Sequence, residues 1–228
     1  MKLNAVEKAL MNNPLRALVQ RRHEAALMER LGGRTEGLCV LEIGCGRGVG
    51  TEIIFGRFGA REVHAFDLDP DMVARARRRL SGYPPERLRL FVGDAAAVEA
   101  EDASYDAVFD FGAVHHVPGW RRAVAEVARV LRPGGRFFFE EVTHRALSRR
   151  FYRALLSHPP EENWFGGEEF VAELEALGLA VGGNYTEWFF GDFVVGVGRR
   201  AAPGGEFPRA GSDQKEEGVH GAEFSHAV

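Results

Sequence analysis

The sequence predicts an α/β protein with a doubly wound, Rossmann-like sheet that is mostly parallel and ends in a C-terminal antiparallel hairpin. Two observations carry this prediction. From Leu38 onward, short apolar runs alternate with amphipathic segments, which is the pattern of βαβ units. In addition, the glycine-rich stretch VLEIGCGRGVG at 40–50 follows the first apolar run, where such folds place a strand-to-helix turn.

The first 33 residues have helical character. Apolar residues recur there at intervals of three and four, as on one face of a helix. Asn13-Pro14 should divide the segment into two helices, with Pro14 at a helix start, and Gly32-Gly33 should end the second. We therefore interpret residues 1–33 as an N-terminal helical lid.

Strands and helices then alternate along the chain. The predicted strands of the parallel part are 38–43, 62–68, 88–94, 104–114 and 135–143. The predicted helices between and after them are 49–58, 69–80, 119–131 and 168–179. Asp69 is placed to cap the second of these helices, with a proline at its first position.

The predicted strands 180–190 and 191–200 follow each other too closely for a parallel crossover. They should form the antiparallel hairpin at the end of the sheet. After Arg200 the sequence is rich in glycine, proline and charge and has few apolar residues, which is typical of a flexible tail. The expected organisation is therefore a helical lid (1–33), one βα domain (34–200) and a flexible tail (201–228).

Composition narrows the classes of function. The net charge of −4 disfavours a nucleic-acid partner. Two cysteines, Cys39 and Cys45, indicate neither a disulfide framework nor a metal site. No apolar stretch reaches the length of a membrane span, and the N-terminus lacks a signal-peptide pattern. We expect a cytoplasmic monomer or homodimer, with peripheral membrane contact left open through Arg21, Arg22 and His23.

The glycine-rich stretch does not fit a dinucleotide-binding loop. That fingerprint needs glycine at its sixth position, and Val49 stands there when the count starts at Gly44. The pattern is instead acid-x-Gly-x-Gly-x-Gly, beginning at Glu42. A carboxylate would repel a pyrophosphate and attract an ammonium group, so the loop indicates a ligand with a cationic end.

Two further acids complete the ligand's description. Asp67 ends the second strand, where doubly wound folds bind ribose hydroxyls. Asp94 ends the third strand, within reach of an adenine edge. One ammonium group, one ribose and one adenine without a phosphate describe S-adenosylmethionine.

With these motifs, residues 38–140 resemble a class I S-adenosylmethionine-dependent methyltransferase. VLEIGCGRG, VHAFDLDPDMVARAR, FVGDA, YDAVFDFGAVHHV and VARVLRPGGRFFFEE match the family's motifs in order. The resemblance implies S-adenosylmethionine as cofactor and a binding set of Glu42, Gly44, Cys45, Gly46, Gly48, Asp67, Leu68, Met72, Asp94, Ala95 and Phe111.

The acceptor site should lie beyond the carboxyl ends of strands four and five. Its catalytic candidates are His115, His116 and Glu140, and Tyr152, Trp164 and Phe165 are candidate apolar walls. We expect His115 near the acceptor and His116 in packing. Because neighbouring strand residues face opposite sides, only Glu140 or Glu141 should face the pocket, and we favour Glu140.

The expected acceptor is a small molecule: a phenol, quinone, amine, carboxylate or lipid. DFGA at 110–113 lacks the motif of base-amino methyltransferases, which argues against nucleic acid. Two alternatives stay open. One is a nicotinamide-dependent oxidoreductase, and the other is a non-catalytic domain that binds S-adenosylmethionine.

Overall fold

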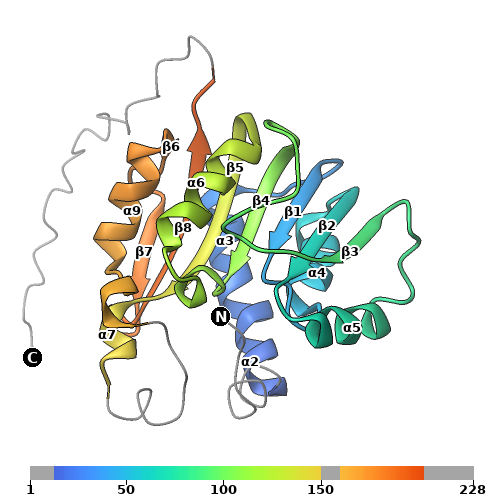
Figure 1. The fold of residues 1–228 in the computed structure, drawn as a ribbon, viewed down its shortest axis with the longest axis horizontal. Helices are drawn as coiled ribbons and strands as arrows, with labels where there is room; N and C mark the ends of the chain where they lie inside the picture. The colour runs from blue at the N-terminus through green and yellow to red at the C-terminus, as the bar shows by residue number, and fades with distance from the viewer. Residues whose placement is uncertain (1–12, 150–159, 203–228) are drawn as a thin grey trace, which may run out of the picture.

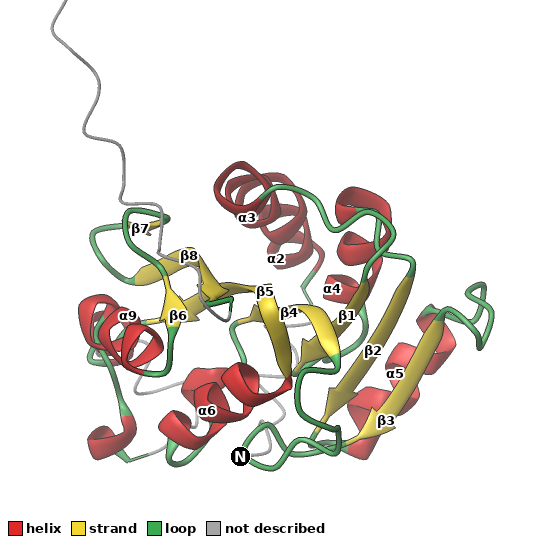
Figure 2. Cartoon of the chain, turned by 90° about the horizontal axis from the view of Figure 1, so that it is seen from above, coloured by secondary structure: helices red, strands yellow, loops and turns green. Residues whose placement is uncertain are grey.

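A computed structural model describes residues 13–149 and 160–202 of the chain. The expectations for residues 1–12, for the tail from residue 203 and for an acceptor wall at Tyr152 lie outside these ranges. The described residues form one mixed sheet with helices on both faces, as Figures 1 and 2 show. The predicted doubly wound architecture is therefore confirmed.

The sheet has the strand order β3-β2-β1-β4-β5-β8-β6, and β7 pairs with β8. Its strands are β1 (Cys39–Ile43), β2 (Glu62–Asp67), β3 (Leu88–Val92), β4 (Tyr105–Phe111), β5 (Leu131–Val142), β6 (Leu179–Ala180), β7 (Tyr185–Trp188) and β8 (Phe193–Arg200). Strands β1 to β5 pair in parallel, while β8 runs antiparallel to β5, β6 and β7. The order reverses at β1 and β4, so their carboxyl ends diverge and leave a crevice.

The helices divide between the two faces of the sheet (Figure 2). One face carries α3 (Ala25–Gly32), α4 (Val49–Ile53) with its π-helical continuation η2 (Ile54–Phe58), and α5 (Pro70–Arg79). The other carries α6 (Trp120–Val130) and α9 (Gly167–Ala176). The remaining short helices are η3 (Val114–His116), α7 (His144–Leu147) and η4 (Glu161–Asn163).

The N-terminal segment begins with α2 (Pro14–Val19), continues through a π-helical turn η1 (Gln20–Glu24) and ends in α3. The predicted helix start at Pro14 and stop at Gly32-Gly33 are confirmed, since Gly33 takes a left-handed φ of 73°. Ala25 and Met28 are fully buried, so α3 is part of the layer that covers the sheet. The part of this segment that reaches the crevice is η1, through Gln20.

The sheet is rigid at its centre because aromatic side chains stack across neighbouring strands. The rings of Phe109 on β4 and Phe138 on β5 lie parallel with centroids 4.4 Å apart, and Phe58 of η2 packs edge-on against both. All three side chains are fully buried. Large aromatic side chains dominate the burial energy of such a core, which fixes the strand ends that carry the polar side chains described next.

Candidate active site

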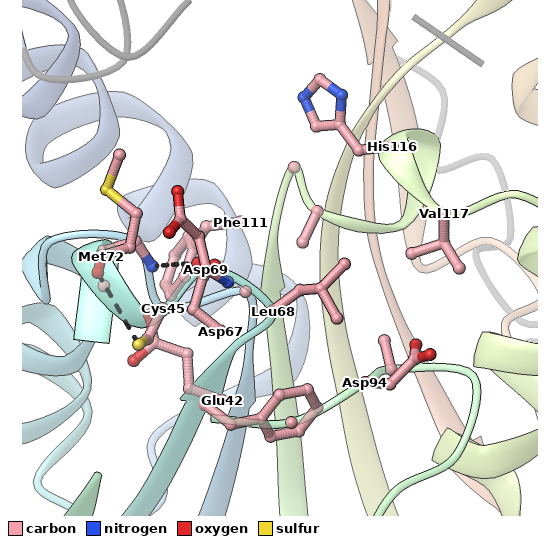
Figure 3. A pocket seen from close by; sticks show the side chains of 18 of the residues that line it. Glu42, Cys45, Asp67, Leu68, Asp69, Met72, Asp94, Phe111, His116 and Val117 are labelled. Carbon is pink, nitrogen blue, oxygen red and sulfur yellow. Dashed lines mark hydrogen bonds between the residues drawn. The ribbon is translucent and has the colours of Figure 1, made fainter. Parts of the chain in front are cut away.

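The carboxyl ends of β1, β2 and β4 open into a cavity of about 390 Å³, a volume in the range of small-molecule sites (Figure 3). The predicted binding residues that line it are Glu42, Gly44, Cys45, Gly46, Asp67, Leu68, Met72, Asp94, Ala95 and Phe111. The sequence therefore located one continuous wall of the cavity, drawn from four separate segments of the chain.

Gly48 is the predicted binding residue that does not line the cavity. It precedes α4 in a left-handed conformation with φ of 88° and faces α5, where an added Cβ would lie 2.7 Å from Leu80 Cδ1. Its glycine is thus required for helix packing. Gly44 packs closely against Ala113, which follows β4, because a Cβ at Gly44 would lie 2.3 Å from the Cβ of Ala113.

Glu42 places a carboxyl group at the bottom of the cavity. Its side chain is 1% exposed and accepts a hydrogen bond from the hydroxyl of Thr51. Burial raises its pKa to about 8, and the nearby acids Asp67 and Asp110 act in the same direction. A buried carboxyl of this kind ionises readily only when a cationic group comes close, which fits an ammonium ligand.

Asp67 is held in place by the backbone around it. The amide of Gly46 donates to one carboxylate oxygen at 2.9 Å and the amide of Asp69 donates to the other at 2.8 Å. The side chain is partly exposed and lines the cavity. The glycine loop and the acid of β2 therefore fix each other, which gives two hydroxyl groups of a ligand a preformed acceptor.

Asp94, Ala95 and Leu68 also line the cavity. Asp94 is exposed and accepts from the amide of Ala96 at 2.9 Å, which closes the turn after β3. Met72, on the first turn of α5, is 4% exposed and borders the same space. Apolar side chains beside one carboxylate suit a flat heterocycle with a polar edge.

Cys45 contributes mainly its backbone, as expected. Its amide donates to the carbonyl of Phe66 at 2.9 Å, which ties the loop to β2. The side chain is 4% exposed, and burial raises the pKa of its thiol well above the usual value. A thiol in that state is a poor nucleophile.

The prediction for the two histidines was the wrong way round. His115 is 5% exposed, and its Nδ1 lies 2.6 Å from Glu141 Oε2, away from the cavity wall. His116 lines the cavity and stands at its rim in Figure 3. Both belong to the single 3₁₀ turn η3, and their ring centroids lie 4.0 Å apart. The sequence pattern did not resolve which of the two lines the cavity.

Glu140 does not face the cavity either, which corrects the third catalytic prediction. It is fully buried, and Arg16 Nη2 on α2 donates to its Oε2 at 3.2 Å. The same guanidinium donates to both carboxylate oxygens of Glu24, at 2.6 and 2.7 Å. Burial and the neighbouring Glu24 raise the pKa of Glu140 to about 8, against the opposing effect of Arg16.

Glu141 points to the opposite face, as strand alternation requires. It accepts from the amides of Val114 and His115 as well as from the ring of His115. Burial raises its pKa to about 7. Glu140 holds α2 through Arg16, and Glu141 holds η3 through Val114 and His115. Both carboxyl groups therefore position neighbouring helices.

Several cavity residues were not predicted. The lining also includes Gln20, Arg47, Gly112, Ala113, Val117, Pro118 and Arg122. Two of them had a visible signal, since Gln20 belongs to the polar QRRHE stretch and Arg122 follows the predicted strand-four turn. Phe165, a candidate acceptor wall, is 1% exposed and packs on Trp120 and Phe170 in the core.

Comparison with known proteins agrees with this geometry. A sequence model described as a methyltransferase domain matches residues 40–135, which include the glycine loop, Asp67, Asp94 and η3. Over residues 40–135 the chain therefore matches a methyltransferase domain, and its relatives include S-adenosylmethionine-dependent methyltransferases. S-adenosylmethionine is the cofactor of such domains, and Glu42, Asp67 and Asp94, predicted to bind it, all line the cavity.

Two relatives come from Mycolicibacterium smegmatis. A probable S-adenosylmethionine-dependent methyltransferase is 41% identical over 117 residues, which is 51% of this chain and 42% of the relative. A fatty-acid O-methyltransferase is 35% identical over 126 residues, 54% of this chain and 44% of the relative. The chain thus matches less than half the length of each relative.

A solved structure shows the same fold over a greater length. The methyltransferase in complex with the Haloferax volcanii Trm112 methyltransferase activator superposes with a TM-score of 0.68 at 18% identity. The match covers 86% of this chain and 98% of that one. Among the described residues, no helix of this methyltransferase domain is long and apolar enough to cross a membrane.

Proposed function

We propose that this chain transfers a methyl group from S-adenosylmethionine to the carboxylate of a lipophilic small molecule. The observation that carries the proposal is the division of the cavity into two walls. Glu42, Asp67 and Asp94 lie at the carboxyl ends of β1, β2 and β3 and form what we call the cofactor wall, whereas His116 on η3 and Arg122 on α6 form what we call the acceptor wall. One wall is suited to the cofactor and the other to an anionic acceptor.

On the cofactor wall, each acid has a separate role. Glu42 would pair with the ammonium group, Asp67 would accept hydrogen bonds from the ribose hydroxyls, and Asp94 would face the adenine edge. When bound, S-adenosylmethionine supplies an electrophilic methyl group. The contribution of the chain is then mainly alignment of the acceptor with that methyl group, which is where most of the acceleration of such a displacement arises.

On the acceptor wall, charge favours an anion. Arg122 is exposed, and both Arg122 and His116 line the cavity. An ionised carboxylate is already a nucleophile and needs no general base. This agrees with the positions of Glu140 and Glu141, which are committed to Arg16 and His115.

The apolar part of the acceptor wall supports a lipophilic substrate. Val117 and Pro118 line the cavity, and Leu68 is 41% exposed at its edge. The relative that is 35% identical over 126 residues is a fatty-acid O-methyltransferase. An arginine above an apolar rim is the arrangement that a long-chain carboxylic acid requires.

The test is methyl transfer from labelled S-adenosylmethionine to a panel of long-chain acids, phenols and amines. We expect ester formation on the acids. Arg122→Gln should raise KM for the acid at least tenfold, because a charge-assisted hydrogen bond is worth about 1.5–3 kcal/mol, while kcat changes little. Arg121→Gln is the matched control, since Arg121 pairs with Glu169 and Glu173 outside the cavity. Transfer to phenols or amines with none to acids would overturn the proposal.

A further inference from the structure

The turn between β7 and β8 presents two aromatic side chains to solvent. Phe189 is 59% exposed and Phe190 is 84% exposed, the largest exposed fractions among the apolar side chains described. Both have left-handed backbone, with φ of 54° and 62°. Gly191 continues the turn with φ of 82°.

This conformation is costly for phenylalanine. A left-handed non-glycine residue costs roughly 1–2 kcal/mol, and asparagine or glycine is the usual choice in such hairpin turns. The turn is nevertheless tied down: Thr143 Oγ1 donates to the carbonyl of Gly191 at 2.6 Å, and Arg145 Nη1 donates to the carbonyl of Phe190 at 3.2 Å. Fold stability alone does not account for two exposed, strained phenyl groups that are held so firmly.

The turn lies at the cavity end of the sheet. Phe193, the first residue of β8, pairs with Val142, the last residue of β5, so the turn sits at the carboxyl ends of the parallel strands. The ring of Trp188, at the base of the turn, lies 4.8 Å from that of His23 on η1. Gln20, three residues earlier on η1, lines the cavity, so less than one helical turn separates the two features along that helix.

Several basic side chains lie near the turn, together with an exposed acid, Glu187, whose Oε2 would be 3.1 Å from a Cβ added at Gly191. His144, Arg145 and Arg149 are exposed at and just after α7, and Arg22 is exposed on η1 beside His23. The acid within the turn, Asp192, is buried and neutralised by Arg149 at 2.8 Å. Two apolar rings inside a basic border are complementary to a surface with an apolar interior and anionic headgroups.

We propose that the Phe189-Phe190 turn inserts into an anionic lipid surface and brings the cavity mouth to lipids held there. The relation to a lipophilic acceptor rests on the proposed function, whereas the docking itself does not. The basic side chains would meet the headgroups, and the two phenyl rings would enter the acyl region.

Vesicle sedimentation of the full chain, without cofactor or acceptor, tests the docking. The wild type should bind vesicles of phosphatidylcholine with phosphatidylglycerol and bind pure phosphatidylcholine weakly. In the double variant Phe189→Asn, Phe190→Gly the partition coefficient should fall roughly a hundredfold, because two phenyl rings no longer enter the lipid. Since these residues relieve the left-handed strain, the melting temperature should be unchanged or higher, so lost binding would not reflect misfolding.

Val92→Thr is the matched control, because Val92 is 49% exposed on β3 at the opposite edge of the sheet. It should bind vesicles as the wild type does. Equal binding by the double variant, or no binding by the wild type, would overturn the proposal. So would a wild-type dimer that the double variant converts to monomer without any vesicle binding, which would assign the turn to a second copy of the chain. Failure of methyl transfer with vesicle binding intact would overturn the proposed function alone.

Discussion

Replacing Arg16 by methionine should destabilise the protein strongly at neutral pH and weakly in mild acid. The Arg16 side chain is 25% exposed, while its partners Glu24 and Glu140 are 2% and 0% exposed. Removing the cation leaves two carboxyl groups buried without their partner. Such a loss costs about 3–5 kcal/mol when the remaining groups stay charged.

Proton uptake limits that cost and gives it a pH dependence. Glu140 is mostly protonated at pH 7 because its pKa is already about 8, so the change falls mainly on Glu24. Burial raises the pKa of Glu24 above its ordinary value of 4.5. Relative to the unfolded chain, where the ordinary pKa of 4.5 applies, protonating Glu24 at pH 7 costs about 3.4 kcal/mol. This is about 1.36 kcal/mol for each of the 2.5 pH units between 4.5 and 7. At pH 5 the same step costs about 0.7 kcal/mol.

Denaturant unfolding of Arg16→Met at pH 5 and pH 7 measures this difference. The free energy of unfolding should drop by about 3 kcal/mol relative to wild type at pH 7, and by about 1 kcal/mol at pH 5. The sign follows from linkage: the folded variant binds more protons than the unfolded chain above pH 4.5, so its stability falls as pH rises. Arg22→Met, on the exposed side of the same helical segment, should change little at either pH. A loss that is equal at the two pH values would refute the reasoning.

Three further predictions concern the cofactor wall. Asp67→Ala should weaken S-adenosylhomocysteine binding by about 1.5–3 kcal/mol in titration calorimetry, and the exposed Asp71→Ala should not; equal affinity in all three proteins would remove the ribose assignment. In wild type, the affinity for S-adenosylhomocysteine should rise as the pH passes through about 8, the pKa of Glu42. Glu42→Gln should remove the part of that rise due to Glu42. Identical pH profiles of wild type and variant would argue against the ammonium contact. Gly44→Ala should abolish binding, because its Cβ would lie 2.3 Å from that of Ala113, and a crystal structure of a binding-competent variant would contradict this.

The cofactor wall was predictable because its determinants are local. A glycine loop directly follows β1, and Asp67 and Asp94 each stand at or just after the end of one strand. Parallel strands bring their carboxyl ends to one edge of the sheet, so positions relative to strand ends translate directly into positions in the cavity. The antiparallel C-terminal hairpin was predictable for another local reason, since the connection between its two strands is too short for a parallel crossover.

The places of the predicted catalytic side chains were less predictable because they depend on contacts between distant segments. The partner of Glu140 is Arg16, 124 positions earlier in the chain, and no local pattern connects them. The choice between His115 and His116 depends on how a 3₁₀ turn packs on Glu141. Gly48 was assigned to the ligand by its place in the loop, although its contact is with α5.

The most direct test of the central claim is isothermal titration of the wild-type chain with S-adenosylhomocysteine and, separately, with NAD. Glu42 at the bottom of the cavity and Val49 at the sixth position of the loop both disfavour a pyrophosphate. We predict saturable binding of S-adenosylhomocysteine, weakened by Asp67→Ala, and no measurable binding of NAD. Tight binding of NAD without binding of S-adenosylhomocysteine would contradict the account.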